Sequence, residues 1–308
     1  MKLIVFGCQQ VAVDFIKFIK TRPDFELSLV VTYELPLDKS YGYESVTQVC
    51  KDNAIPFEEP RRLDASIISR IEQINPDIIF SIYYRKLFPK TLIDIPKLGC
   101  VNVHPSLLPE YRGPTPTAWA ILNNESNIGV TIHYIDQGID TGDILVQEQI
   151  AIREYETGFE LFNRSMALGA KLLEQHIDDI VTQQLVPKKQ SASGSYFGKF
   201  TQQNRIDWKA RALNVINHIR VCSRPYGGAE TLLLNRYFFI HRAKRHCNPN
   251  YIAQKPGMII EAKNDGNLII SCADSCIETI EYDIYPPLNK SEVDTYLKPG
   301  NTFSNKLP

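Results

Sequence analysis

The chain of 308 residues has few methionines (3), few tryptophans (2), almost no net charge and no long apolar run. A formal net charge of −1 gives no overall basic excess that would favour nucleic acid or an acidic membrane surface as a partner. No apolar stretch approaches the roughly 20 residues that a membrane span needs, and segment 2–7 is too short for a signal-peptide core. These absences predict a cytoplasmic protein with no membrane and no nucleic-acid partner.

The seven cysteines do not form the pattern of a disulfide framework or a metal site. Their number is odd and their spacing irregular, which is typical of a protein in a reducing compartment. Cys272 and Cys276 form a lone CxxxC pair, and no second pair completes a zinc site. The sequence therefore predicts no metal.

Short apolar runs alternate with helical patterns in the first half of the chain. This alternation predicts an α/β fold with a Rossmann-like, mostly parallel sheet that has helices on both faces. Ligands of such sheets bind beyond the carboxyl ends of the strands. The expected strands are 3–6, 27–32, 76–81 and 101–104, and the expected helices are 11–20, 45–53 and 115–122.

The pattern changes in the second half of the chain. It predicts an antiparallel strand pair joined by a loop, then one long helix, a Ser/Gly-rich linker, and a small C-terminal β-barrel (OB-like) domain. We therefore divide the chain into a catalytic domain (1–198) and a β-rich domain (199–308). The expected elements are strands 128–135 and 144–152, helix 157–182, linker 191–198, and strands 231–240, 258–262, 268–272 and 276–282.

Three side chains in the first domain are suited to acyl transfer to an amine. Asn102 and His104 are two residues apart on an expected strand, so both side chains lie on one face of it. Asn102 can donate an N–H to the oxyanion of a tetrahedral intermediate, and His104 can accept and return a proton near neutral pH. Asp140, in the later loop 136–143, can accept from the imidazole and orient it.

Each of these residues taken alone also has an ordinary structural explanation. A histidine before a proline can be a buried structural residue, and Asp140 can be a turn aspartate. Their order and spacing together favour catalysis. His133, two residues after Thr131 on an expected strand, is interpreted as structural.

The segment from Asn102 to Gly113, followed by Gly129-Val130-Thr131-Ile132 and Asp140-Thr141-Gly142-Asp143, resembles the folate-dependent formyltransferase family. The resemblance implies that Asn102, His104 and Asp140 are catalytic and that 10-formyltetrahydrofolate is the formyl donor. The positions that it assigns to the folate pocket are Lys86, Leu87, Phe88, Asp136, Gln137, Gly138 and Ile139. Where a relative has an arginine that contacts the folate, this chain has Pro114, so Arg112 is a candidate to replace that contact.

Within the family, the sequence most resembles the formyltransferase domain that acts on UDP-4-amino-4-deoxy-L-arabinose. The likeness includes the segments 80–85, 197–199, 206–208 and 224–229. It implies an enzyme that formylates the primary amine of a UDP- or dTDP-linked amino sugar for surface polysaccharide (O-antigen) biosynthesis, and a homodimer. Methionyl-tRNA formyltransferase is the alternative, and a formyltetrahydrofolate hydrolase is a further one.

The choice of a nucleotide sugar over tRNA depends on charge. The stretch 32–39 is short and net negative, whereas gripping tRNA requires many Lys or Arg contacts. A nucleotide sugar needs one or two cations and an aromatic surface. For Trp208 a place in the core, and for Tyr83 and Tyr84 packing roles, are equally compatible with the sequence. The candidate substrate residues are Tyr83, Tyr84, Lys199, Arg205, Trp208 and Arg220.

Overall fold

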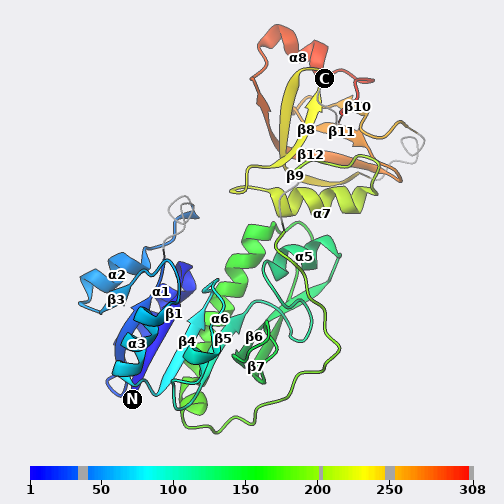
Figure 1. The fold of residues 1–308 in the computed structure, drawn as a ribbon. Helices are drawn as coiled ribbons and strands as arrows, with labels where there is room; N and C mark the ends of the chain where they lie inside the picture. The colour runs from blue at the N-terminus through cyan, green and yellow to red at the C-terminus, as the bar shows by residue number, and fades with distance from the viewer. Residues whose placement is uncertain (34–40, 201–203, 247–253, 305–308) are drawn as a thin grey trace. The chain divides into compact units, whose positions relative to one another are not determined.

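The computed structural model describes residues 1–33, 41–200, 204–246 and 254–304 (Figure 1). The chain forms two compact units. Unit 1 comprises Met1–Pro116, Asn127–Ala151 and Phe162–Lys199, and unit 2 comprises Thr117–Ser126, Ile152–Leu161 and Phe200–Pro308. Each unit has its own buried core.

Unit 1 contains a seven-stranded sheet in the order β3-β2-β1-β4-β5-β6-β7. The pairs from β3 to β5 are parallel, and β6 and β7 are antiparallel additions at one edge. Val, Ile and Phe dominate the central strands because both faces are covered. The strands are β1 (Lys2–Gly7), β2 (Glu26–Val31), β3 (Phe57–Glu58), β4 (Ile78–Ile82), β5 (Cys100–His104), β6 (Asn127–Tyr134) and β7 (Ile144–Ala151).

Helices cover both faces of this sheet. One core cluster joins the sheet to α1 (Gln9–Lys20), α2 (Val46–Asp52) and the long helix α6 (Gly158–Val181), which is green in Figure 1. The opposite face packs on α3 (Ala65–Ile74) and α4 (Lys90–Ile93). The predicted α/β class is thereby confirmed. The short strand β3 and the helix α3 were not predicted: only two side chains of α3, Ile67 and Ile71, are buried, so its apolar stripe is weak.

Unit 2 contains a five-stranded antiparallel sheet in the order β10-β11-β12-β9-β8. Its two outer strands are bridged by the segment 302–304, because Thr302 pairs with Met258 before β10 and Ser304 pairs with Leu232 of β8. The sheet is therefore closed on itself, as predicted for a small barrel. The strands are β8 (Ala229–Leu233), β9 (Arg236–His246), β10 (Ile259–Ala262), β11 (Leu268–Ser271) and β12 (Cys276–Tyr285).

Three short helices, α5 (Pro116–Leu122), α7 (Ala212–Cys222) and α8 (Lys290–Tyr296), complete the described elements. Helix α7 was not predicted, because its buried side chains include the polar Asn217 and Arg220. The predicted strand 231–240 is wrong: it is a hairpin of β8 and β9 that turns at Leu234, whose φ is 55°. No helix among the described residues is long and apolar enough to cross a membrane.

The aromatic core of unit 2 gives a test of its stability. Phe303 is 4% exposed and contacts Trp208 and Phe238, with ring centroids 5.5 and 5.0 Å away. Phe303→Ala should lower the free energy of unfolding of this unit by about 3–5 kcal/mol, because a cavity replaces the ring. Both tryptophans of the chain, Trp119 and Trp208, belong to unit 2, so urea denaturation followed by tryptophan fluorescence reports on it. Leu234→Ala, at a side chain that is 57% exposed, is the control; an equal loss in both variants would contradict the packing argument.

Candidate active site

Asn102 and His104 lie at the carboxyl end of β5, on the same face of the strand. Val101 and Val103, which alternate with them, are 0% and 2% exposed in the core on the other face. Across the antiparallel pair with β6, Asn102 lies opposite His133 and His104 opposite Thr131. The hydrophobic side of β5 thus fixes the direction of its polar side.

The loop 136–143 turns Asp140 back toward β5. The carboxylate of Asp136 accepts hydrogen bonds from the Gly138 N–H (3.0 Å) and the Thr141 hydroxyl (2.6 Å), which closes a tight turn. A Cβ at Gly142 would lie 1.9 Å from the Tyr134 carbonyl oxygen, so only glycine fits there. Asp140 has a φ of 54°, in the left-handed region that few residues other than glycine adopt.

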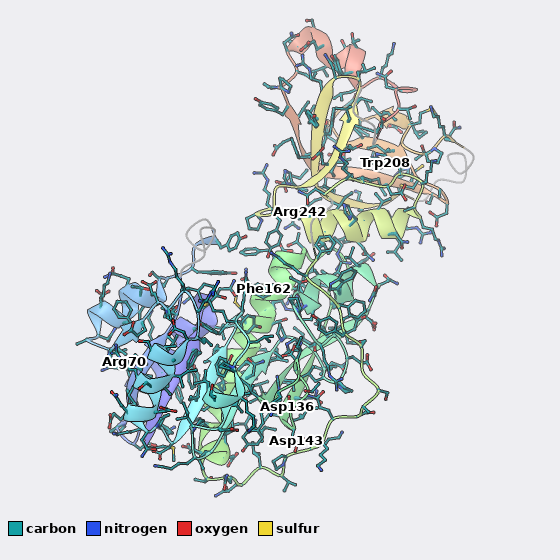
Figure 2. The ribbon with its side chains drawn as sticks, viewed as in Figure 1. Arg70, Asp136, Asp143, Phe162, Trp208 and Arg242 are labelled. Carbon is teal, nitrogen blue, oxygen red and sulfur yellow. The ribbon has the colours of Figure 1, made fainter. Side chains whose placement is uncertain are left out.

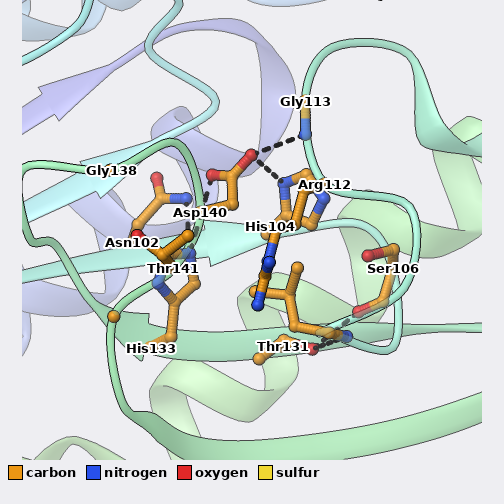
Figure 3. Close-up of polar contacts among 12 residues, drawn as sticks. Asn102, His104, Ser106, Arg112, Gly113, Thr131, His133, Gly138, Asp140 and Thr141 are labelled. Atoms are coloured by element: carbon orange, nitrogen blue, oxygen red, sulfur yellow. Dashed lines mark hydrogen bonds and ion pairs between the residues drawn. The ribbon is translucent and has the colours of Figure 1, made fainter. Parts of the chain in front are cut away.

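Asp140 lies between two histidines and a backbone amide (Figure 3). Its Oδ2 accepts a hydrogen bond from the Gly113 N–H at 2.8 Å and lies 3.6 Å from Nδ1 of His104. Its Oδ1 lies 3.8 Å from Nε2 of His133. The side chains of His104 and Asp140 are 6% and 17% exposed. The fold thus brings the predicted trio of Asn102, His104 and Asp140 to one place, while their catalytic roles remain a prediction.

The orientation of His104 differs from the sequence-based expectation. Its Nε2 is 2.9 Å from the carbonyl oxygen of Tyr111, which can only accept, so Nε2 carries the hydrogen. The separation of 3.6 Å between Nδ1 and the Asp140 carboxylate is too long for a hydrogen bond. The Tyr111 carbonyl, rather than Asp140, therefore orients the ring, and Nδ1 is the nitrogen that can exchange a proton beside the carboxylate.

His133 belongs to this site, although the sequence analysis set it aside as structural. Its Nδ1 donates to the Tyr134 carbonyl at 2.7 Å, and its Nε2 lies 3.1 Å from the Asn102 Nδ2. Burial lowers the pKa of His133 to about 4, so at neutral pH Nε2 is a lone-pair acceptor for the Asn102 amide. His133 thereby fixes which way the amide points. The feature that could have indicated this role is the position of His133 directly opposite Asn102 on the neighbouring antiparallel strand.

The loop 105–113 is hydrogen-bonded to side chains of β6 and β7, the two antiparallel strands at one edge of the sheet. Thr131 donates its hydroxyl hydrogen to the Ser106 carbonyl and accepts from the Leu108 N–H, and Gln147 donates to the Leu108 carbonyl. The Ser106 hydroxyl donates to the Glu110 carbonyl at 2.7 Å. These buried bonds hold the loop that carries the Tyr111 carbonyl and the Gly113 amide.

The predicted folate positions fall into two groups. The side chains of Leu87 and Ile139 are 72% and 39% exposed, and Gln137 and Gly138 are also exposed. The others have internal contacts. The Lys86 ammonium donates to the carbonyls of Pro60 and Arg61, the Phe88 ring lies 4.6 Å from the Phe6 ring, and the Asp136 carboxylate closes its own loop.

Arg112, the candidate to replace the arginine contact missing at Pro114, has hydrogen-bond partners within unit 1. Its Nε and Nη2 donate to the Gln190 side chain, and Nη2 also donates to the Ser191 carbonyl. A contact of Arg112 with the folate remains a prediction.

Two of the predicted substrate residues, Trp208 and Arg220, are buried in unit 2. Trp208 is 4% exposed and donates its indole N–H to Thr231 in the barrel core, where Figure 2 labels it. Arg220 is 9% exposed and is bound by the carbonyls of Arg153 and Glu156 and by the side chain of Asn217. Neither side chain can meet a substrate without leaving its unit's interior.

The other four predicted substrate residues vary in exposure. Lys199 is exposed, and Arg205, half exposed, lies 3.7 Å from Glu230. Tyr83 packs with a ring-centroid distance of 5.5 Å on Phe162, and Tyr84 is buried. Both tyrosine hydroxyls are buried without a hydrogen-bond partner. Their roles as substrate contacts remain predictions.

The chain belongs to the formyl transferase family. The model of the formyl transferase domain matches residues 29–177, and that of the formyl transferase C-terminal domain matches residues 199–284. The chain is 31% identical to a methionyl-tRNA formyltransferase of Thermodesulfovibrio yellowstonii over 85% of each protein. It is 30% identical to a methionyl-tRNA formyltransferase of Clostridioides difficile over 100% of this chain and 99% of that protein.

A solved structure shows the same fold. An N-formyltransferase from Helicobacter canadensis, in complex with folinic acid and dTDP-3-aminofucose, superimposes with a TM-score of 0.70 at 22% identity. The match covers 92% of this chain and all of that one. At this identity the match establishes the fold and leaves the acceptor open.

The prediction of a nucleotide-linked amino sugar as acceptor is wrong. Relatives that match this chain at 30–31% identity over 85–99% of their length are named methionyl-tRNA formyltransferases, which was the alternative. The predicted role in surface polysaccharide biosynthesis depended on that acceptor and has no support without it. The predicted homodimer stays a prediction. Among the described residues, no cluster of His, Cys, Asp and Glu has the arrangement of a metal site.

The position of His104 gives a test of its role. His104→Ala should lower kcat for formyl transfer by about 10²–10⁴-fold, because the proposed proton carrier beside the Asp140 carboxylate is lost. Binding of a folate analogue, measured by calorimetry, should stay within about threefold. His176→Ala on α6 is the control. Turnover near the control's value would remove His104 from the reaction.

The buried neutral His133 predicts a pH dependence of stability. Its folded-state pKa of about 4 lies below the unfolded value of 6.5, so the unfolded chain binds more protons between these two pH values. The contribution of neutral His133 to the free energy of unfolding is fully present above pH 6.5. It decreases by ~3 kcal/mol as the pH falls toward 4.

His133→Gln should reduce this loss, because glutamine does not titrate. The measurement is urea denaturation followed by circular dichroism at intervals from pH 4 to 7, with His176→Gln as the control. Parallel curves for wild type and His133→Gln would show that His133 has the same pKa in the folded and unfolded protein, which would contradict the prediction.

Proposed function

We propose that this protein transfers the formyl group of 10-formyltetrahydrofolate to the α-amino group of methionyl-tRNA. The main support is the grouping of Asn102, His104 and Asp140 in a chain that matches methionyl-tRNA formyltransferases along almost its whole length. An amide donor, a proton carrier and an acid at one place suit acyl transfer in which the substrate supplies its own nucleophile.

In the proposed reaction the amine attacks the formyl carbon, forming a C–N bond and placing negative charge on the formyl oxygen. Asn102 donates an N–H to this oxygen; its amide is already aligned by His133. Nδ1 of His104 takes the proton that the amine loses and delivers it to N10 of the folate as the N10–C bond breaks. The carboxylate of Asp140, 3.6 Å away, stabilises the imidazolium between these two transfers.

Exposed apolar side chains on the two predicted folate segments suit the flat donor. Ile139 lies next to Asp140, and its side chain is 39% exposed; Leu87 is 72% exposed after β4. An aromatic pterin can pack on such side chains and bond to the backbone of an open loop such as 137–139. Pro114 removes the family's arginine contact, so this chain's affinity for the donor depends more on such packing.

The overall charge of −1 does not exclude a tRNA acceptor, because phosphates are contacted locally. The stretch 32–39, used above against tRNA, lies largely outside the described residues. In unit 2, β9 carries Arg242, Lys244 and Arg245 within four residues. Arg242 and Lys244 pair with Glu160 and Glu278, and Arg245 is exposed, which makes it a candidate phosphate contact.

The acceptor can be tested directly. The enzyme with 10-formyltetrahydrofolate should form formyl-methionyl-tRNA with a kcat/KM about 100-fold or more above that for any UDP- or dTDP-linked amino sugar. The kcat/KM for tRNA should fall steeply between 50 and 200 mM salt. The His104→Ala variant is the control for site-dependent turnover. Formylation of an amino sugar but not of charged tRNA would refute the proposal, and formate release without any amine would identify a hydrolase.

A further inference from the structure

The segment 188–197, predicted as a linker in most of its length, is bound to both loops of the candidate site. At one end Lys188 exchanges two backbone hydrogen bonds of 2.8 Å with Ile144, next to the loop 136–143. At the other end the Arg112 N–H donates to the Ser195 carbonyl at 2.9 Å, and the Phe197 N–H donates to the Arg112 carbonyl at 3.0 Å. We call this segment the strap. It is tied by hydrogen bonds to the residues beside the site and is not a free connection.

One side chain of the strap, Gln190, spans the two loops. Its Oε1 accepts from Nε and Nη2 of Arg112 at 3.2 and 2.8 Å. Its Nε2 donates to the carbonyls of Asp140 and Gly142 at 2.9 and 2.7 Å. Both acceptor sites and both donor hydrogens of the amide are therefore used, which is the full capacity of a glutamine side chain.

The groups that Gln190 holds are the neighbours of the candidate catalytic side chains. Asp140 keeps a left-handed backbone (φ 54°), and the bond from Gln190 to its carbonyl helps to hold that conformation. Arg112 lies between Tyr111, whose carbonyl orients His104, and Gly113, whose amide holds the Asp140 carboxylate. A single amide thus connects the backbone that places the acid with the backbone that places the base.

We propose that Gln190 is a positioning residue for formyl transfer, acting through Asp140 and Arg112 to set the separation between the His104 Nδ1 and the Asp140 carboxylate. The inference rests on the proposed formyl-transfer chemistry of this site but not on the identity of the acceptor. A displacement of about 1 Å at a catalytic group can cost about 10²-fold in rate, so a side chain that touches neither reactant can still control kcat.

Two substitutions distinguish the bonds of Gln190 to Arg112 from its bonds to the carbonyls of Asp140 and Gly142. Gln190→Leu has a similar size and removes all four hydrogen bonds. Gln190→Glu keeps acceptors for Arg112 but turns a carboxylate oxygen toward the carbonyls of Asp140 and Gly142, which repels the loop. Gln184→Leu, the same replacement at an exposed position after α6, is the matched control.

We expect Gln190→Leu and Gln190→Glu to lower kcat by about 10- to 100-fold, with the KM for the acceptor within about threefold of wild type. The melting temperature should stay near that of Gln184→Leu. Hydrogen exchange at the Gly113 amide should become faster in both Gln190 variants, because its acceptor, the Asp140 carboxylate, is no longer held in place.

The outcomes distinguish this inference from the proposed function. If the wild type formylates no acceptor, the proposed function fails, and exchange at the Gly113 amide alone decides the role of Gln190. A kcat within about twofold of the Gln184→Leu value in either Gln190 variant overturns the positioning role. Unchanged exchange at Gly113 also overturns it, as does a lowered melting temperature with normal kcat, which is the signature of a purely structural residue.

Discussion

The hydrogen bond from the Gly113 amide to the Asp140 carboxylate joins the two loops on which the candidate site depends. One loop follows β5 and carries the carbonyl that orients His104; the other connects β6 to β7 and carries the acid. Because β5 and β6 are antiparallel, the first loop begins at His104 and the second begins beside Cys100, at the other end of β5. The second loop folds back toward His104, and this bond fixes the spacing of the two loops. A Cβ at Gly113 would lie 2.5 Å from the Phe197 carbonyl oxygen, so the strap also restricts that position to glycine.

The histidines of the site have opposite hydrogen-bonding surroundings, and this difference separates their functions. His133 donates to a carbonyl and accepts from the Asn102 amide, so a neutral ring satisfies both neighbours, in agreement with its lowered pKa. His104 faces a carbonyl and a carboxylate, which are both acceptors. An imidazolium at His104 would donate to the Tyr111 carbonyl and point its other N–H toward the Asp140 carboxylate, 3.6 Å away. An imidazolium at His133 would turn a hydrogen toward the amide hydrogens of Asn102. The environment thus suits His104 to carry a proton and His133 to hold an amide.

Sequence patterns predicted most of the sheet of unit 1 because its strands are continuous apolar runs between helical repeats. They failed where polar residues are buried or apolar stripes are thin, as in α7 with Asn217 and Arg220 and in α3 with only two buried side chains. The same limit explains Trp208 and Arg220, which look like ligand contacts in sequence but satisfy their polar groups inside unit 2. The acceptor was misjudged because a count of net charge carries no information about where charges gather.

The sequence alone determined the family motif, the alternation of strands and helices, and the spacing that places Asn102 and His104 on one face of β5. Those are local properties, governed by the two-residue period of a strand and by the chemistry of each side chain. The tertiary structure decided which groups meet: the Tyr111 carbonyl at His104, His133 at Asn102, and Gln190 between Arg112 and Asp140. Gln190 and Asp140 are fifty residues apart in the chain, and only the folded strap brings them within hydrogen-bond distance.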